Sequence, residues 1–111
     1  MGKRSRDKGK RGELELAAAF RAEGFDARRG QQHKGGSDSP DVMVDGLPWL
    51  YPECKRVETY SIRQLYDALA LARREGGPEK LPAVFYRRND HERLVVMGFE
   101  DFCKLAREYE P

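Results

Sequence analysis

Apolar and polar residues follow one another along this chain with two different periods, one typical of helices and one typical of strands. Apolar residues recur at helical spacing in three segments, so we expect helices at residues 13–23, 61–75 and 99–109. Extended patterns rich in β-branched and aromatic residues predict strands at residues 26–29, 41–45, 49–57, 83–87 and 93–97. The expected order of elements is therefore α-β-β-β-α-β-β-α.

Local signals predict where these elements end. Gly24 is expected to cap the C-terminus of the first helix, with Phe25 packing back onto it. Ser61 is expected to be the N-cap of the second helix. The segment 30–40 is rich in Gly, Ser, Gln and His and is predicted to be a loop. The tripeptide 46–48, Gly-Leu-Pro, predicts a turn.

The apolar stripes predict which residues face the core. For the second helix the expected core residues are Ile62, Leu65, Tyr66 and Leu69. For the last helix they are Phe102, Leu105, Ala106 and Tyr109. We therefore expect a mixed α/β domain in which helices cover a sheet.

Length and composition limit the class of protein. A chain of 111 residues has room for one domain core. No apolar run reaches the length that crosses a bilayer, and no secretory signal is visible, so we expect a cytoplasmic protein, in the host cytoplasm if the source is a virus. Cys54 and Cys103 have no metal-site spacing, and we expect both to be reduced, buried thiols.

The net charge is only +2, but the basic residues are clustered at the N-terminus. The cluster comprises Lys3, Arg4, Arg6, Lys8, Lys10 and Arg11. We expect residues 1–11 to form a flexible arm, because they have nothing apolar to bury, and residues 12–111 to form the domain. The arm is either a phosphate-binding segment or a solvated tail.

Two carboxylates and a lysine are predicted to meet on one face of a sheet. In a hairpin centred on Leu47, Asp41 lies opposite Glu53, with Cβ atoms about 5 Å apart, although a bulge would shift this register by one residue. Two such carboxylates repel each other unless a cation lies between them, and Mg²⁺ prefers oxygen ligands of this kind. Lys55 lies two residues after Glu53 and so shares its face.

The remaining hairpin residues test this register. The opposite face carries a coherent apolar set: Val42, Val44, Leu50, Pro52 and Cys54. The Asp41 face also carries Met43, Trp49 and Tyr51. The alternative interpretation is a surface hairpin with an ordinary cross-strand ion pair, and these apolar companions argue against it.

Glu13 is a further candidate. Ala17 and Phe20 follow it at four and seven residues, which places its carboxylate on the buried stripe of the first helix. Burial of a carboxylate is costly unless it is paired or bound to a metal. The alternative is a surface residue that complements the helix dipole.

The string Ser-Pro-Asp at residues 39–41, followed by Glu-Cys-Lys at 53–55, resembles the signature of the PD-(D/E)xK nucleases. Other segments resemble the archaeal-type Holliday junction resolvases of that superfamily. They are Gly-Glu-Leu-Glu-Leu at 12–16, Gly-Phe at 24–25, Arg-Arg at 28–29, Gly-Gly-Ser at 35–37 and Gln64. The resemblance extends from Gly12 to the last helix.

This resemblance implies a restriction-endonuclease-like fold, with a central mixed five-stranded sheet flanked by about three helices. It implies that Asp41, Glu53 and the backbone carbonyl of Cys54 hold Mg²⁺, with Mn²⁺ as a substitute. Glu13 would support the metal directly or through water. Lys55 would position or activate the attacking water, and Gln64 would brace the lysine or the water.

The same resemblance implies a homodimer that resolves four-way DNA junctions by symmetric paired cuts. One chain holds one such site, so paired cuts need two subunits related by a two-fold axis. The second helix and the last two strands are candidate dimer surfaces, with Phe85, Tyr86, Tyr66 and Leu71 available, although each of these four residues is also a candidate for the core.

Junction recognition would rely on shape and phosphates. The expected DNA contacts are the basic arm together with Arg28, Arg29, Lys34, Ser37 and Arg56. His33 has no place in the family pattern and is either a phosphate contact or an exposed loop residue.

Two other functions stay open. One is another small nuclease of the same superfamily, of phage or repair type, that acts on flaps, single strands or duplex DNA. The other is a nucleic-acid-binding module without activity on the same fold. An intact set of Asp41, Glu53 and Lys55 favours an enzyme.

Overall fold

The computed structural model of the protein describes residues 3–30 and 40–109. Its elements are α1 (Lys3–Ala22), β1 (Ala27–Arg29), β2 (Val42–Val44), β3 (Leu50–Arg56), α2 (Ile62–Gly76), β4 (Leu81–Arg87), β5 (Leu94–Val96) and α3 (Phe99–Glu108). The order predicted from the hydrophobic pattern is therefore confirmed, and the protein is an α/β domain.

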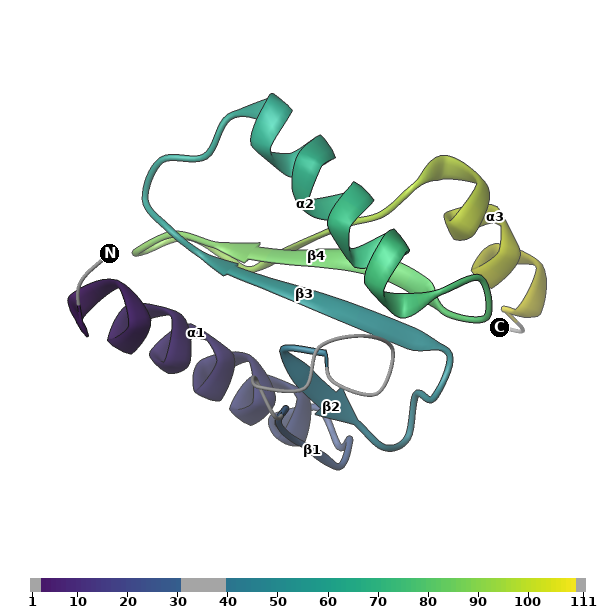
Figure 1. Ribbon diagram of the computed structural model, residues 1–111. Coiled ribbons are helices and arrows are strands. Elements are labelled where there is room, and N and C mark those ends of the chain that lie inside the picture. Colours follow the sequence, from purple (N-terminus) through teal and green to yellow (C-terminus); the bar gives the residue numbers. More distant parts are fainter. Residues whose placement is uncertain (1–2, 31–39, 110–111) are drawn as a thin grey trace.

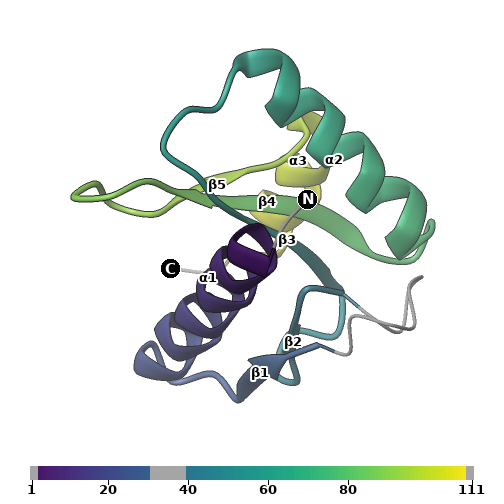
Figure 2. The same ribbon diagram turned by 60° about the vertical axis from the view of Figure 1, so that its left-hand side comes forward.

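The strands form two sheets. β3 and β4 are parallel, and β5 pairs with β4 in the antiparallel sense, which makes a three-stranded sheet in the order β3-β4-β5. β1 and β2 form a separate antiparallel pair. Within the described residues, the predicted single five-stranded sheet is therefore wrong. Figures 1 and 2 show α2 on one face of the three-stranded sheet and α1 with β1 and β2 on the other.

The predicted hairpin between residues 41 and 57 is also wrong. β2 pairs with β1, with Arg28 opposite Met43, and β3 pairs with β4 instead. The connection between β2 and β3 consists of two successive turns, because Leu47 N–H donates to Val44 O and Leu50 N–H donates to Leu47 O, each at 3.0 Å. These turns direct β3 away from β2 and across to the other sheet.

The main core lies between α1, the small sheet and β3. It consists of Leu16, Ala17, Ala27, Val42 and Val44, and the partly buried Phe20, Leu47, Cys54 and Phe85 pack against it. Val42 and Val44 are buried as predicted for this face. Cys54 is only half-buried, although burial raises the pKa of its thiol to about 12, and the nearby Asp41 carboxylate adds to that rise.

The caps of the first two helices are as predicted. Gly24 follows α1 with a φ of 97°, and Phe25 N–H donates to Phe20 O at 3.0 Å, so the chain folds back onto the helix. The rings of these two phenylalanines lie edge to face, with centroids 6.1 Å apart. The Ser61 hydroxyl accepts a hydrogen bond from Gln64 N–H, and the Gln64 side chain accepts one from Ser61 N–H, which completes a capping box.

The face that α2 buries is not the predicted one. Its buried residues are the small ones, Ala68, Ala72 and Gly76, whereas Ile62 is 68% and Tyr66 is 72% exposed. Small side chains allow α2 to approach β3 and β4 closely, and the large apolar side chains at its N-terminal end then project beyond the sheet. Leu65 and Leu69 lie between the buried and the exposed sides of α2 and are half-buried.

The inward stripe predicted for α3 is wrong for three of its four residues, and the fourth, Leu105, is half-buried. Phe102 and Tyr109 are 56% and 70% exposed, and Ala106 is exposed as well. The buried residue of α3 is Asp101, whose carboxylate accepts a hydrogen bond from Arg73 of α2 at 2.9 Å. An ion pair therefore fastens this helix, and its aromatic residues face outward.

Apolar residues of α2, β5 and α3 form what we call the apolar face. It consists of the exposed Ile62, Tyr66 and Phe99, with the half-buried Leu65, Leu69 and Val96 beside them. A groove of about 300 Å³ runs between the start of α2 and the segment from β5 to α3. A monomer rarely exposes so many large apolar side chains in one region, so this face is typical of an interaction surface.

Helix α1 begins at Lys3 rather than at Glu13, so the boundary predicted between a basic arm and the first helix is wrong. Lys10 and Arg11 lie on the surface of that helix. The binding of DNA by this segment stays a prediction. Among the described residues, no helix combines the length and the apolar character that crossing a membrane requires.

Candidate active site

Asp41 and Glu53 come together, although by a route other than the predicted hairpin. Asp41 directly precedes β2, and Gly30 N–H donates to its carbonyl at 2.9 Å, which extends the pairing of β1 with β2. The Asp41 side chain crosses to the other sheet, where its Oδ2 accepts a hydrogen bond from Cys54 N–H at 2.9 Å. This contact fixes the carboxylate beside Glu53 in β3.

The Glu53 side chain lies in the central part of β3 and is only 6% exposed as a residue. Burial raises the pKa of its carboxyl to about 7, and repulsion from Asp41 adds to the rise. Burial also raises the pKa of Asp41, against the hydrogen bond from Cys54 N–H and the positive charge of Lys55. The nearby Glu53 side chain opposes that rise in the pKa of Asp41, after Cys54 N–H and Lys55.

Lys55 shares the sheet face of Glu53, as predicted from their spacing. Its Nζ lies 3.4 Å from Glu53 Oε2. Burial lowers the pKa of the ammonium, but the Glu53 carboxylate, with Tyr60 and Asp41, raises it by more, and the net direction is upward. Lys55 is therefore held as a cation beside the carboxylate pair.

Glu13 stands at the edge of this cluster. It is buried on the inner side of α1, as predicted, but its Oε1 accepts a hydrogen bond from Arg29 Nε at 2.7 Å. Burial raises the pKa of Glu13, Arg29 opposes that rise, and Asp41 and Lys55 act on it electrostatically. Its charge is already compensated by Arg29, so direct metal coordination finds no support here. A role through water stays a prediction.

The carboxylate pair fits a cation. Two neighbouring carboxylates that repel each other are stabilised when a cation lies between them. Within residues 3–30 and 40–109, however, no group of three or more His, Cys, Asp and Glu side chains is arranged to hold a metal. A cation bound here would therefore take its other ligands from backbone carbonyl groups, water or a substrate phosphate, as Mg²⁺ commonly does.

Gln64 has a structural task in this arrangement. Its Oε1 accepts a hydrogen bond from Ser61 N–H at 2.7 Å in the capping box of α2. The capping box explains a glutamine at this position without any catalytic role. The bracing of Lys55 or of a water by Gln64 stays a prediction.

Several expected DNA contacts are engaged in ion pairs on the protein itself. Arg28 pairs with Asp45 at 2.7 Å, and Arg29 pairs with Glu13 at the same distance. Arg56 pairs with Glu15 and Glu58. His33, Lys34 and Ser37 lie outside the described residues, as do the side chains of Lys3, Arg4, Arg6 and Lys8. The predicted DNA contacts of all these residues stay predictions.

Glu75 was not predicted as part of this cluster. This residue near the end of α2 accepts a hydrogen bond from the buried Tyr51 hydroxyl at 3.5 Å. Its negative charge helps to raise the pKa of Asp41 and that of Glu53, after the larger effect of burial on each. Only the packing of α2 on β3 brings it near, and no local spacing in the sequence signals that contact.

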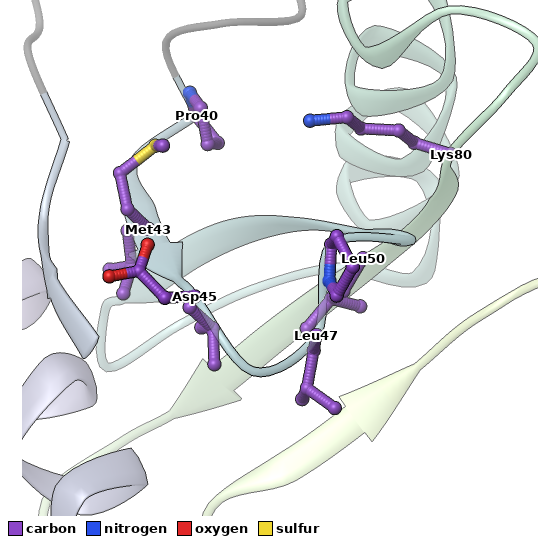
Figure 3. Close-up of a pocket in the computed structure, with 9 residues that line it drawn as sticks. Pro40, Met43, Asp45, Leu47, Leu50 and Lys80 are labelled. Carbon is purple, nitrogen blue, oxygen red and sulfur yellow. The ribbon is translucent and has the colours of Figure 1, made fainter. Parts of the chain in front are cut away.

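A small pocket lies next to the candidate site but contains none of its acidic residues. It measures about 170 Å³ and is lined by residues of β2, the following turns and the start of β3, together with Lys80. Figure 3 shows the Lys80 side chain extending toward Pro40 across this pocket, with Met43 and Asp45 on the side of β2. Neither Asp41 nor Glu53 lines it, so we assign it no catalytic part.

The raised pKa of Glu53 predicts how stability depends on pH in the absence of divalent ions. The carboxyl binds its proton more tightly in the folded chain than at its ordinary pKa of 4.5, so ionisation disfavours the fold. The contribution of the Glu53 carboxyl to the free energy of unfolding is therefore complete below pH 4.5, and it is lost as the pH rises toward 7. We expect the loss to be on the order of 3 kcal/mol.

Urea unfolding of the wild type and of Glu53→Gln across this range, in EDTA, measures the effect. The Gln variant should lose much of the pH dependence, whereas Asp45→Asn, at an exposed position, should keep it. Equal slopes for all three proteins would show that the Glu53 proton is not coupled to folding.

The candidate site thus consists of the half-buried Asp41 and the buried Glu53, with Lys55 paired to Glu53, and Glu13 and Glu75 lie at its edge. These groups come from α1, the start of β2, β3 and α2. Comparison with protein-family models and with curated proteins finds no match for this chain.

Proposed function

We propose that this protein is a metal-dependent DNA endonuclease with Asp41, Glu53 and Lys55 at its centre. The observation that carries the proposal is the convergence of these three side chains from two separate segments, in the order Pro-Asp and then Glu-x-Lys. An ordinary surface ion pair does not account for a half-buried Asp41 carboxyl beside the buried Glu53 carboxyl, whereas a cation site does.

Asp41, Glu53 and the carbonyl of Cys54 would hold Mg²⁺, for which Mn²⁺ would substitute. A bound divalent ion supplies a water of lowered pKa and neutralises charge that develops on the phosphate. Lys55 orients the attacking water or the phosphate through its ammonium, which the ion pair with Glu53 keeps in place. Asp41 is held for this task by the hydrogen bond from Cys54 N–H.

We also propose that the domain has a restriction-endonuclease-like fold. A restriction-endonuclease-like domain is supported by the order of elements and by a carboxylate before one strand followed by Glu-x-Lys within the next. The parallel pair β3 and β4, joined through α2, gives the sheet its mixed character.

As substrate we propose a four-way DNA junction cut by a homodimer. Paired symmetric cuts require two sites, and each chain supplies one. The apolar face on α2, β5 and α3 supports association with a second copy through two of the predicted regions, the second helix and the last strand. Of the predicted residues, Tyr66 is exposed there, whereas Phe85 packs against the main core.

Cleavage of three substrates tests this function. A mobile four-way junction, a flap and a linear duplex are incubated with the protein in Mg²⁺ and in EDTA. We expect paired nicks at symmetric positions of the junction in Mg²⁺ alone.

Equal cleavage of all three substrates would favour another small nuclease of the same superfamily. If the junction is bound but nothing is cut with Mg²⁺ or Mn²⁺, a nucleic-acid-binding module becomes the better account.

A further inference from the structure

Two tyrosines lie beside the candidate site without a part in it. Tyr86 of β4 is directly opposite Lys55 of β3 in the parallel register, and Val84 is opposite Glu53. Alternate residues of a strand share a face, so Tyr86 lies on the same sheet face as Lys55 and Glu53. Its neighbour Phe85 packs on the other face, against the main core.

Tyr60, in the connection between β3 and α2, covers Tyr86. The two rings are stacked, with centroids 5.4 Å apart and planes 15° from parallel. Both side chains are half-buried, so the stack is open to solvent in part. Tyr60 also lies within electrostatic reach of the Lys55 ammonium, which joins the stack to the candidate site.

A network of polar contacts fixes the segment that carries Tyr60. Arg56 donates hydrogen bonds to Glu58 and to the Asn89 side chain. Glu58 in turn accepts from Asn89 N–H at 3.1 Å. These contacts tie the connection after β3 to the turn between β4 and β5. The stacked geometry is therefore organised before any ligand binds, which lowers the entropic cost of binding.

A surface pocket of about 630 Å³ opens beside the two rings. Its walls are Tyr60, Tyr86, Arg88, Asp90, His91, Glu92 and Leu94. Arg88 Nη2 lies 3.1 Å from His91 Nε2, and both side chains are exposed at the rim. The pocket thus combines flat aromatic walls, a guanidinium that suits a phosphate, and carboxylates that accept hydrogen bonds.

A flat ring with polar edges, attached to a phosphate, matches these walls. Bases stack on aromatic side chains whatever their sequence, and cationic groups nearby bind the backbone. Paired bases in a duplex have no free face, so only an unpaired base fits.

We propose that Tyr60 and Tyr86 form a stacking platform for an unpaired DNA base next to the phosphate that is cut. This inference rests on the proposed function in that it takes DNA as the substrate. It adds that the preferred strand carries a splayed nucleotide beside Lys55, as at a branch point or a single-stranded end.

Binding of a short single-stranded oligodeoxyadenylate, in Ca²⁺ instead of Mg²⁺ so that cleavage is suppressed, tests the platform. We expect Tyr60→Leu and Tyr86→Leu each to weaken binding by about 5- to 150-fold, the range that corresponds to loss of one base–aromatic stack. Tyr86→Phe keeps the ring and should bind as the wild type does. Tyr109→Leu, at an exposed tyrosine after α3, is the matched control and should also bind normally.

Duplex binding in the same buffer separates stacking from general attraction to DNA. It should change little in the Leu variants. Unchanged single-strand binding in Tyr60→Leu would overturn the proposal, as would equal losses for single strand and duplex. Tyr60 lies outside the strands and helices, so this variant decides the matter even if Tyr86→Leu fails to fold.

Failure of the platform is distinguishable from failure of the nuclease. If the protein cuts DNA with Mg²⁺ but binds single strands equally well without Tyr60 or Tyr86, the platform alone is refuted. Tyr-dependent binding by a protein that cuts nothing would refute the nuclease and retain the platform.

Discussion

Replacement of Asp41 by Asn is expected to lower the rate of metal-dependent DNA cleavage by at least about a thousandfold, since the charge stabilisation that a bound metal provides amounts to several kcal/mol. The fold should survive, because the Asn carbonyl oxygen still accepts the hydrogen bond from Cys54 N–H. Folding of the metal-free variant should even improve, because the repulsion between Asp41 and Glu53 is gone. Single-turnover cleavage and urea unfolding measure the two effects separately.

The matched control for this variant is Asp45→Asn. Asp45 is exposed and pairs with Arg28, away from Glu53, so cleavage should stay close to that of the wild type. Junction binding should be retained in both variants. Cleavage by Asp41→Asn at the wild-type rate would show that Asp41 takes no part in catalysis.

Gly76→Ala is expected to destabilise the fold by about 1–3 kcal/mol, the usual cost of overpacking a core. A Cβ atom at Gly76 would lie 2.8 Å from Cγ and 3.0 Å from Cβ of Tyr51. Tyr51 is fully buried in β3, so it has no free space to move into, and α2 must shift away from the sheet. Denaturant unfolding measures the loss.

Gly9→Ala supplies the opposite case in the same chain. Gly9 is also helical, but nothing lies within 4 Å of the position where its Cβ would stand. The substitution should therefore stabilise the protein by about 0.5–1 kcal/mol through the helix propensity of alanine. If Gly76→Ala raised stability as Gly9→Ala does, the close approach of α2 to Tyr51 would be wrong.

The succession of elements could be predicted because each one carries its own local pattern. Val84, Phe85 and Tyr86 give β4 the β-branched and aromatic composition of a strand, and α2 begins with a capping box that the sequence shows as Ser-x-x-Gln. Strand partners were not predictable in the same way. Nothing in the sequence near Leu47 distinguishes a hairpin from two turns that lead into a separate sheet, because that choice depends on contacts of β3 with β4.

The proximity of Asp41, Glu53 and Lys55 was predicted, but from the wrong strand pairing. Asp41 and Glu53 meet because a hydrogen bond from Cys54 N–H draws one side chain across to β3, and not because two strands pair. Glu75 escaped prediction because it is a neighbour only through the packing of α2. The Pro-Asp and Glu-x-Lys strings indicated this proximity although the predicted hairpin was wrong, because they specify side chains and not strand partners.

The apolar stripes of α2 and α3 were misread for a physical reason. Hydrophobic periodicity reports that a helix face avoids water, but it does not say whether the cover comes from the same chain. The stripe of Ile62 and Tyr66 was therefore assigned to the core, and the structure leaves it on the apolar face. In α2 the residues that pack on the sheet are alanines and a glycine, which carry a weak apolar signal.

The way α3 is fastened has a consequence for local opening. Its buried link to α2 is the contact between Asp101 and Arg73, while Phe99 and Phe102 face outward. A helix held so lightly opens at a small fraction of the cost of global unfolding. In dilute solution its amide hydrogens should exchange with deuterium long before those of β4. Covering its aromatic residues with a second copy would slow that exchange, so α3 is a built-in reporter of self-association.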